Sequence, residues 1–137
     1  MGIALMGIAT FAQAEGNGTK WDNLIKAISE VESRGNTNAV SGHHVGILQI
    51  SPILVKDCNR INRLKGIQKQ YALNDRYDKR KSIEMFNIIQ DFYNPNRNIE
   101  KAVRLWNGGP KATTKSTQGY LERVMKALRE IEKSAKR

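Results

Sequence analysis

The sequence predicts a single, mainly helical domain with a small irregular or β-like insert after its first helix. Apolar residues recur at helical spacing in five segments. The chain of 137 residues has the length of one domain and is short for two. The polar residues 36–44 and the short apolar run 45–50 separate the first segment from the second, and they form the predicted insert. No internal repeat or long linker divides the chain.

The first helix is predicted to begin at Thr19 and to end at Gly35. Thr19 is followed three residues later by Asp22, an arrangement similar to a capping box. Glycine is a natural stop at the end of a helix. The apolar face of this helix consists of Trp21, Leu24, Ile25, Ile28 and Val31.

Four further helices are predicted after the insert. The second is expected over 51–66, because Ser51 and Pro52 have the residue types of an N-cap and a first helical position. The third begins at Asn74 or Asp75, and the sequence NGGP ends the fourth. The predicted core positions of the four helices are Ile53, Leu54, Ile61 and Leu64; Ile83, Phe86 and Ile89; Ile99, Ala102, Val103 and Trp106; and Leu121, Val124, Leu128 and Ile131.

Residues 1–14 have the pattern of a secretory signal. They carry no charge, are mostly apolar and end in Ala-Gln-Ala, which is an A-x-A cleavage pattern. The segment is shorter than the roughly 20 apolar residues that a transmembrane helix needs. We therefore expect a signal peptide over 1–14, truncated because its basic start is missing, and one domain over 15–137. The alternative is an apolar N-terminal helix that packs on the domain.

The chain is strongly basic, with 23 Lys and Arg against 13 Asp and Glu and a formal charge of +10. Such a surface favours polyanions, among them nucleic acid, wall polymers and anionic membrane surfaces. An export signal and the lack of a recognisable nucleic-acid motif argue against nucleic acid. Composition does not choose between the other two.

Three residues are candidates for redox or metal chemistry: Cys58, His43 and His44. Cys58 is the only cysteine, so the chain has no internal disulfide. It lies in an apolar-patterned stretch without a base partner, and we expect a small buried residue. The two histidines lack a carboxylate or cysteine partner at ligand spacing, which predicts loop residues at the rim of a cleft. We expect no metal and no cofactor.

Two glutamates, Glu30 and Glu32, lie near the end of the first predicted helix. At about 100° per residue, with Ile28 at zero, Glu32 falls at about 40°, within the apolar stripe, and Glu30 at about 200°, facing water. Partial burial and the negative end of the helix dipole both raise the pKa of Glu32. A carboxyl that is protonated near neutral pH can act as a general acid. The alternative is a structural glutamate paired with a cation such as Arg34.

Four sequence blocks follow in order from this helix end. They are Glu32-Ser33; Ala39-Val40-Ser41; Gly46-Ile47-Leu48-Gln49 with Pro52; and the segment LWNGGP, with Asn107, Gly109 and Pro110, followed by GYLERV. In order and spacing they resemble the signature of the SLT-type lytic transglycosylase family, which cleaves bacterial peptidoglycan. The blocks cover most of residues 21–125.

Several positions depart from the family pattern. His43-His44-Val45 stands where the family carries Gly-Ala, in a loop that is one residue short. Trp106 replaces a Tyr, and Ser51 replaces a Met. The block between residues 66 and 98 has no match. The loop and Trp106 changes concern substrate fit more than the catalytic carboxyl.

The resemblance implies a lysozyme-like fold with Glu32 as the catalytic acid and base. The substrate-binding residues that it implies are Ser33, Ser41, Gln49, Trp106, Asn107 and Tyr120. Within this set, Ser33 is expected to support the helix end and the Glu. Trp106 has an alternative role in the core, because its helical phase joins Ile99 and Val103. We expect the partner to be peptidoglycan glycan strands, with loose association with anionic envelope surfaces and no nucleic acid. The protein would be an exported monomer, periplasmic or secreted.

No Asp or Glu lies between Glu32 and Asp57, whereas most glycoside hydrolases use two carboxylates. A lytic transglycosylase needs one, which protonates the bond between N-acetylmuramic acid and N-acetylglucosamine and then deprotonates the 6-hydroxyl to close a 1,6-anhydro ring. A hydrolytic muramidase and a non-catalytic glycan-binding module remain alternatives. The later carboxylates for which the sequence leaves a place in the cleft open are Asp57, Asp75, Asp78, Glu84 and Asp91.

Overall fold

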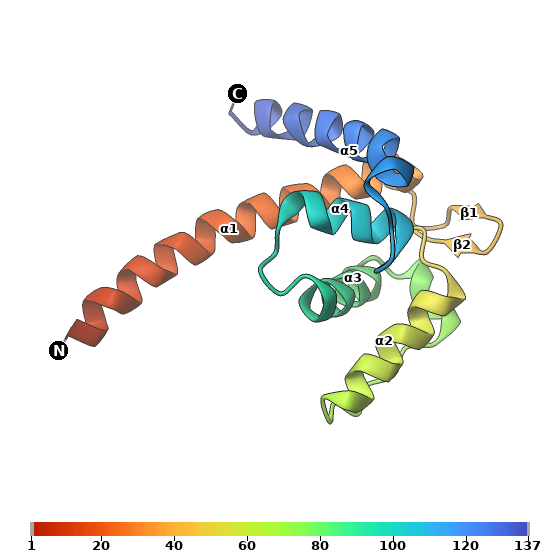
Figure 1. Ribbon diagram of the computed structural model, residues 1–137, viewed down its shortest axis with the longest axis horizontal. Helices are drawn as coiled ribbons and strands as arrows, with labels where there is room; N and C mark the ends of the chain where they lie inside the picture. The colour runs from red at the N-terminus through yellow and green to blue at the C-terminus, as the bar shows by residue number, and fades with distance from the viewer. Residues whose placement is uncertain (1, 137) are drawn as a thin grey trace.

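The computed structural model describes the backbone of residues 2–136 and the side chains of residues 18–136. Its elements are α1 (Gly2–Ser33), β1 (Val40–Ser41), β2 (His44–Val45), α2 (Pro52–Leu64), the 3₁₀ helix η1 (Leu73–Tyr77), α3 (Lys79–Tyr93), α4 (Ile99–Gly108) and α5 (Thr114–Ala135). Figure 1 shows α5 and α4 lying along the second half of α1, with α2 and α3 on the other side of α4. The predicted mainly helical domain with a small β insert is confirmed.

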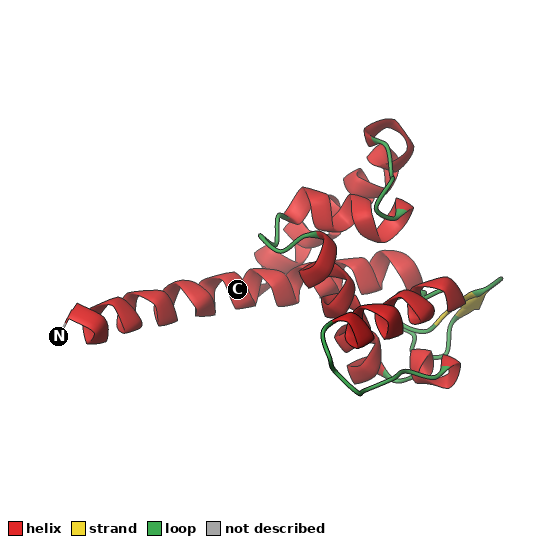
Figure 2. Cartoon of the chain, turned by 60° about the horizontal axis from the view of Figure 1, so that its bottom comes forward, coloured by secondary structure: helices red, strands yellow, loops and turns green. Residues whose placement is uncertain are grey.

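The first helix is longer than predicted. α1 runs without a break from Gly2 through the glycine-containing segment 15–18, so the predicted start at Thr19 is wrong. A capping-box pattern permits a helix to start but does not stop one, and each interior glycine costs only about 1 kcal/mol. The N-terminal half of α1 projects away from the other helices (Figures 1 and 2). Signal cleavage after residue 14 stays a prediction. In the part of the chain that the structure describes, no helix is both long enough and apolar enough to cross a membrane.

The start of α2 is as predicted, but its buried face is not. The Ser51 hydroxyl accepts a hydrogen bond from the Leu54 amide at 3.2 Å, which makes Ser51 the N-cap. Ile53 and Leu64, predicted as core, are 79% and 66% exposed. The helix buries only the stripe made by Val55, Cys58, Ile61 and Asn62. At about 100° per residue, Ile53 and Leu64 fall on the opposite face, which no neighbouring helix covers.

The third helix begins one turn later than predicted. Asp78 is the N-cap of α3, and its carboxylate accepts a hydrogen bond from the Lys81 amide at 2.8 Å. Asp75, one of the two predicted caps, accepts from the Ala72 amide and closes the 3₁₀ turn η1 instead. The extended backbone at Asp78, with a ψ of 122°, interrupts helical hydrogen bonding between the two elements.

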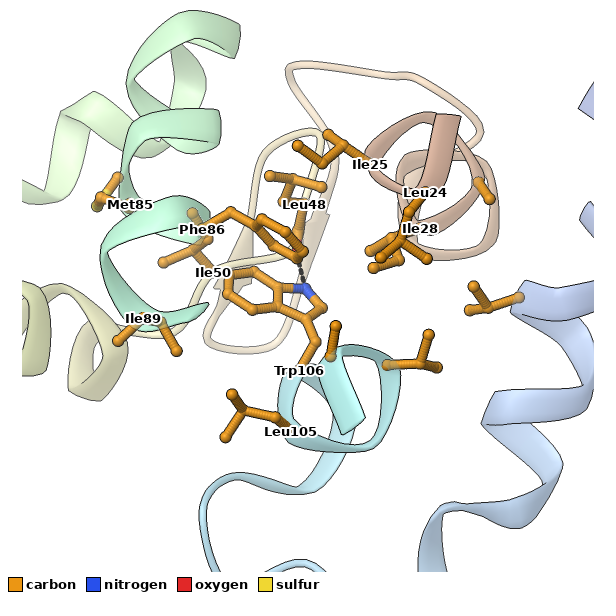
Figure 3. Packing of buried hydrophobic residues seen from close by; sticks show 14 of the residues in the cluster. Leu24, Ile25, Ile28, Leu48, Ile50, Met85, Phe86, Ile89, Leu105 and Trp106 are labelled. Atoms are coloured by element: carbon orange, nitrogen blue, oxygen red, sulfur yellow. Dashed lines mark hydrogen bonds between the residues drawn. The ribbon is translucent and has the colours of Figure 1, made fainter. Parts of the chain in front are cut away.

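The core is organised around aromatic rings from three helices, of which Figure 3 labels those of Phe86 and Trp106. Phe86 of α3 lies between Trp21 of α1 and Trp106 of α4, with ring centroid separations of 5.8 and 4.8 Å. The Trp106 indole N–H donates to the Leu48 carbonyl at 3.2 Å, which ties the insert to this cluster. Burying the ring while pairing its one polar group satisfies both parts of the tryptophan side chain. Trp106 is therefore a core residue, as one of its two predicted roles required.

The insert is held against η1 by one buried arginine. The Arg76 guanidinium donates to the carbonyls of His43 and Ile50, both at 3.1 Å. Gly46, with a φ of +88°, packs against the Arg76 carbonyl, where a Cβ would collide. The antiparallel pair β1–β2 alone is too short to be stable, so these contacts fix the insert next to the end of α1.

Candidate active site

Glu32 lies in the last turn of α1 with a half-buried side chain, whereas Glu30 is exposed. The helical phase predicted from the sequence is thus confirmed for both residues. Beyond Glu32 the chain turns away at once, because Arg34 and Gly35 adopt φ values of 54° and 76°. The Arg34 amide donates to the Glu30 carbonyl at 3.0 Å, which closes the helix in the manner of an αL cap, and the Gly35 amide donates to the Ser29 carbonyl at 3.3 Å. The carboxyl is therefore placed at the negative end of α1.

The principal partner of the Glu32 carboxyl is a tyrosine from the far end of the chain. The Tyr120 hydroxyl, on α5, donates to Glu32 Oε2 at 3.0 Å. Tyr120 is only 5% exposed. Burial and the neighbouring Glu32 carboxylate raise the pKa of Tyr120, so the phenol stays protonated and remains a donor across the physiological range.

The pKa of Glu32 is raised above the ordinary value of a glutamate. Burial is the largest cause, because desolvation disfavours the charged carboxylate. The Tyr120 hydrogen bond and the positive charge of Arg123 oppose this rise in part. In the described part of the chain, no cation lies within ion-pair distance of Glu32, so the alternative of a pair with Arg34 does not hold. The raised pKa favours the protonated carboxyl, which is the form that can donate a proton.

Arg123 belongs to this site but was not predicted from the sequence. Its guanidinium lies over the Tyr120 ring, 5.8 Å from the centroid. The two residues are three positions apart on α5 and so lie on the same helical face. This spacing could have indicated Arg123 from the sequence, because it places the Arg123 cation on the helical face that carries Tyr120. We call Glu32, Tyr120 and Arg123 the acid cluster.

Ser33 connects the acid cluster to the insert. Its hydroxyl donates to the Ile47 carbonyl at 2.8 Å and lies 3.2 Å from the Ser29 carbonyl. Both partners are backbone groups of the protein, which is the supporting role expected for this serine. A substrate-binding role for Ser33 stays a prediction.

Gln49, Trp106 and Asn107 line one cavity of about 550 Å³, which we call the large cavity. The Gln49 amide nitrogen donates to the carbonyls of Gly46 and Ala39 at 2.9 and 3.2 Å, so its orientation is fixed. Its backbone φ of 53° is uncommon for a residue other than glycine, and such conformations often occur at functional sites. Trp106 is largely buried, with 8% of its surface exposed, so it contributes little surface to this cavity.

The remaining predicted contacts lie apart from the large cavity. Neither Glu32 nor Tyr120 is among the residues that line it, and neither are Ser33 and Ser41. Ser41 is exposed on β1. The structure therefore places Glu32 and Tyr120 in the acid cluster and Gln49, Trp106 and Asn107 in the wall of the large cavity, and it leaves Ser41 outside both. The bond from Ser33 to Ile47 joins them through the insert that carries Gln49.

Among the five later carboxylates, Asp57 is the one that lines the large cavity. Both of its oxygens have partners: Arg60 Nε lies 2.8 Å from Oδ1, and the Tyr93 hydroxyl donates to Oδ2 at 2.8 Å. The other four are engaged in structural contacts: Asp75 with Lys81, Asp78 as the N-cap of α3, Glu84 with Lys69 and Tyr71, and Asp91 with Arg97.

The thiol and the histidines have the surroundings that the sequence suggested. Cys58 is fully buried, and burial together with the Asp57 charge raises its pKa to about 12, which makes the thiol unreactive. His44 lines the large cavity, and the His43 carbonyl accepts from Arg76. Among the described side chains of residues 18–136, no three His, Cys, Asp or Glu gather in a group that could hold a metal ion.

The model of the transglycosylase SLT domain family matches residues 9–128, which is most of the chain. The chain belongs to this family. SLT domains act on peptidoglycan, so the substrate of this SLT domain is of the glycan class and its place of action is the cell envelope. The mainly helical fold agrees with a lysozyme-like domain, and the resemblance seen in the sequence is confirmed. No curated protein and no solved structure matches the chain.

Proposed function

We propose that this SLT domain is a peptidoglycan lytic transglycosylase. It would cleave the β-1,4 bond between N-acetylmuramic acid and N-acetylglucosamine and leave 1,6-anhydro ends. The observation that carries the proposal is the environment of Glu32: a half-buried carboxyl at a helix end, hydrogen-bonded to a neutral donor and without an ion pair among the described residues. Such a carboxyl can hold a proton at neutral pH and give it up to a substrate.

In the first step, protonated Glu32 gives its proton to the glycosidic oxygen, and the bond from C1 of the muramic acid to that oxygen breaks. The N-acetylglucosamine leaves with a free 4-hydroxyl. Tyr120 stabilises the carboxylate that this step creates, because its hydroxyl already donates to Glu32 Oε2. Proton transfer by a placed side chain contributes roughly 10²–10⁴-fold to a rate.

In the second step, the Glu32 carboxylate takes the proton from the 6-hydroxyl of the same muramic acid. The oxygen attacks C1, the 1,6-anhydro ring closes, and Glu32 returns to its protonated state without consuming water. Because the nucleophile belongs to the same sugar, its attack has the entropic advantage of an intramolecular reaction. A second free carboxylate is not needed, which agrees with Asp57 having both oxygens engaged.

Export and oligomeric state are part of the same proposal. A signal peptide over 1–14 would deliver the domain to the periplasm or the medium, where peptidoglycan lies. The domain would act there as a monomer, and its charge of +10 would favour loose contact with anionic envelope surfaces.

The test is product analysis of purified peptidoglycan digested with the full chain, by mass spectrometry. Anhydro ends are expected, and reducing ends would indicate a muramidase instead. Glu32→Gln should abolish release, and the matched control is Glu30→Gln, which removes an exposed carboxyl from the same helix and should retain wild-type activity. Equal release by Glu32→Gln and wild type would overturn the proposal in favour of another catalytic group.

A further inference from the structure

The outer face of α2 forms one wall of the large cavity. Ile53, Lys56, Arg60 and Arg63 recur at intervals of three and four residues, so they lie on one face of the helix, and all four line the cavity. The row spans about 15 Å at a rise of about 1.5 Å per residue. It lies opposite the stripe that α2 buries. We call it the α2 wall.

The α2 wall carries three cations, and only one of them has an ion-pair partner among the described residues. The cavity lining has three basic side chains, Lys56, Arg60 and Arg63, and a single carboxylate, Asp57, whose ion pair is with Arg60. Lys56 and Arg63 are exposed, and neither side chain has a hydrogen bond or ion pair within the described residues. Like charges on one helix face repel each other. A row of this kind in a concave site favours an anionic ligand.

The rest of the cavity lining has a different chemistry. Leu105, Trp106 and Pro110 provide apolar surface, and the side-chain amides of Gln49 and Asn107 lie in the same lining. A ligand that fills this space would therefore combine neutral polar groups, small aliphatic groups and negative charges. A polyphosphate has only the last of these, whereas a glycan strand with a short acidic peptide has all three.

We propose that the α2 wall is a subsite for the carboxylates of a peptide that branches from the glycan strand. The identity of the glycan rests on the proposed function. The two cations without an ion pair among the described residues, Lys56 and Arg63, are seven positions apart on α2, or about 10.5 Å along the helix axis. Residues three positions apart in an extended peptide are about 10 Å apart, a spacing that these two side chains match. Arg63 and Lys56 would pair with carboxylates, and the exposed Ile53 would contact aliphatic side chains of the peptide.

The subsite is tested by measuring binding affinity, so that cleavage of the strands does not affect the result. The full chain carrying Glu32→Gln is titrated with soluble glycan strands that retain their peptides and with the same strands after an amidase has removed them. We expect the peptide-bearing strands to bind at least about tenfold more tightly, because each charge-assisted contact adds to affinity. Adding Lys56→Gln and Arg63→Gln should reduce this ratio to about twofold or less.

The matched control is Lys126→Gln with Arg129→Gln, which removes the same charge from exposed positions on α5. This variant should keep the tenfold ratio. Equal affinity of the parent for both kinds of strand would overturn the proposal, and so would an equal fall in the ratio for the control pair. Displacement of bound strands by inorganic polyphosphate as efficiently as by the free peptide would also overturn the proposal, because charge alone would then be recognised. Failure of the proposed function would appear separately, as absence of anhydro products from wild type.

Discussion

Two carboxylates, Glu32 in the acid cluster and Asp57 in the wall of the large cavity, differ in what surrounds them. Glu32 receives one hydrogen bond from a buried phenol and has no ion pair among the described residues, and burial raises its pKa. Asp57 is held by the Arg60 guanidinium and the Tyr93 hydroxyl, one on each oxygen. The first environment leaves a proton to be exchanged, whereas the second fixes a negative charge in a cavity wall. Residue type alone does not separate the roles; the partners do.

The largest expected effect is on the rate of cleavage, and it should differ between substitutions of Glu32 and of Asp57. Glu32→Gln should lower the rate of peptidoglycan cleavage by roughly 10²–10⁴-fold, the range expected for a placed proton donor. Asp57→Asn should keep activity within about tenfold, because it disturbs a binding wall and not the proton transfer. Initial rates of the two variants on the same substrate measure the difference. Comparable losses in both would indicate that two carboxylates share the chemistry.

The next effect concerns the donor to Glu32. Tyr120→Phe removes the hydroxyl but keeps the buried ring, and cleavage should slow by about tenfold because the carboxylate loses a charge-assisted hydrogen bond. That bond lowers the pKa of Glu32, so its loss raises the pKa. The limb of the pH–rate profile that requires protonated Glu32 should therefore move to higher pH. A slower enzyme with an unmoved limb would mean that Tyr120 acts only by packing.

A smaller effect is expected where the acid cluster meets the insert. Ser33→Ala removes the hydrogen bond to the Ile47 carbonyl and should lower the free energy of unfolding by about 1 kcal/mol. Urea denaturation of wild type and variant measures this. The matched substitution Ser134→Ala, near the end of α5, should leave stability unchanged. Loss of activity without any change in stability would point instead to direct substrate contact by Ser33.

The smallest effect belongs to Arg123. Because the side chain is exposed, Arg123→Gln should change the cleavage rate by less than about fivefold. The charge of Arg123 lowers the pKa of Glu32, so its removal should move the same limb to higher pH, in the direction seen for Tyr120→Phe. The shift should shrink as salt is added, since exposed charges are screened. A shift of this limb toward lower pH would contradict the conclusion that the charge of Arg123 lowers the pKa of Glu32.

Local periodicity was enough to predict the partial burial of Glu32 but not its partners. The phase of one helix distinguished Glu32 from Glu30, because burial of a helical face repeats every 3.6 residues. Tyr120 came only from the family resemblance, and Arg123 from neither source. Arg123 is near Glu32 only because α5 lies beside the end of α1. This is a tertiary contact between segments about 90 residues apart.

The errors in the predicted fold also arise from tertiary contacts that a single segment does not reveal. Ile53 and Leu64 are apolar and were predicted to be core, but α2 buries only one stripe and leaves their side of the helix uncovered. Which side is buried depends on where α3 packs, and one amphipathic segment does not contain that information. The late start of α3 reflects competition between two aspartates, of which Asp75 caps the short 3₁₀ turn and Asp78 the helix.

The central claim, that one carboxyl acts as acid and then as base without water, is tested most directly by an isotope. Purified peptidoglycan is digested by the full chain in water enriched in oxygen-18, and the new glycan ends are analysed by mass spectrometry. We predict anhydro ends that carry no heavy oxygen, because the attacking oxygen comes from the sugar itself. Reducing ends labelled with oxygen-18 would show that water is the acceptor and would contradict this account of Glu32.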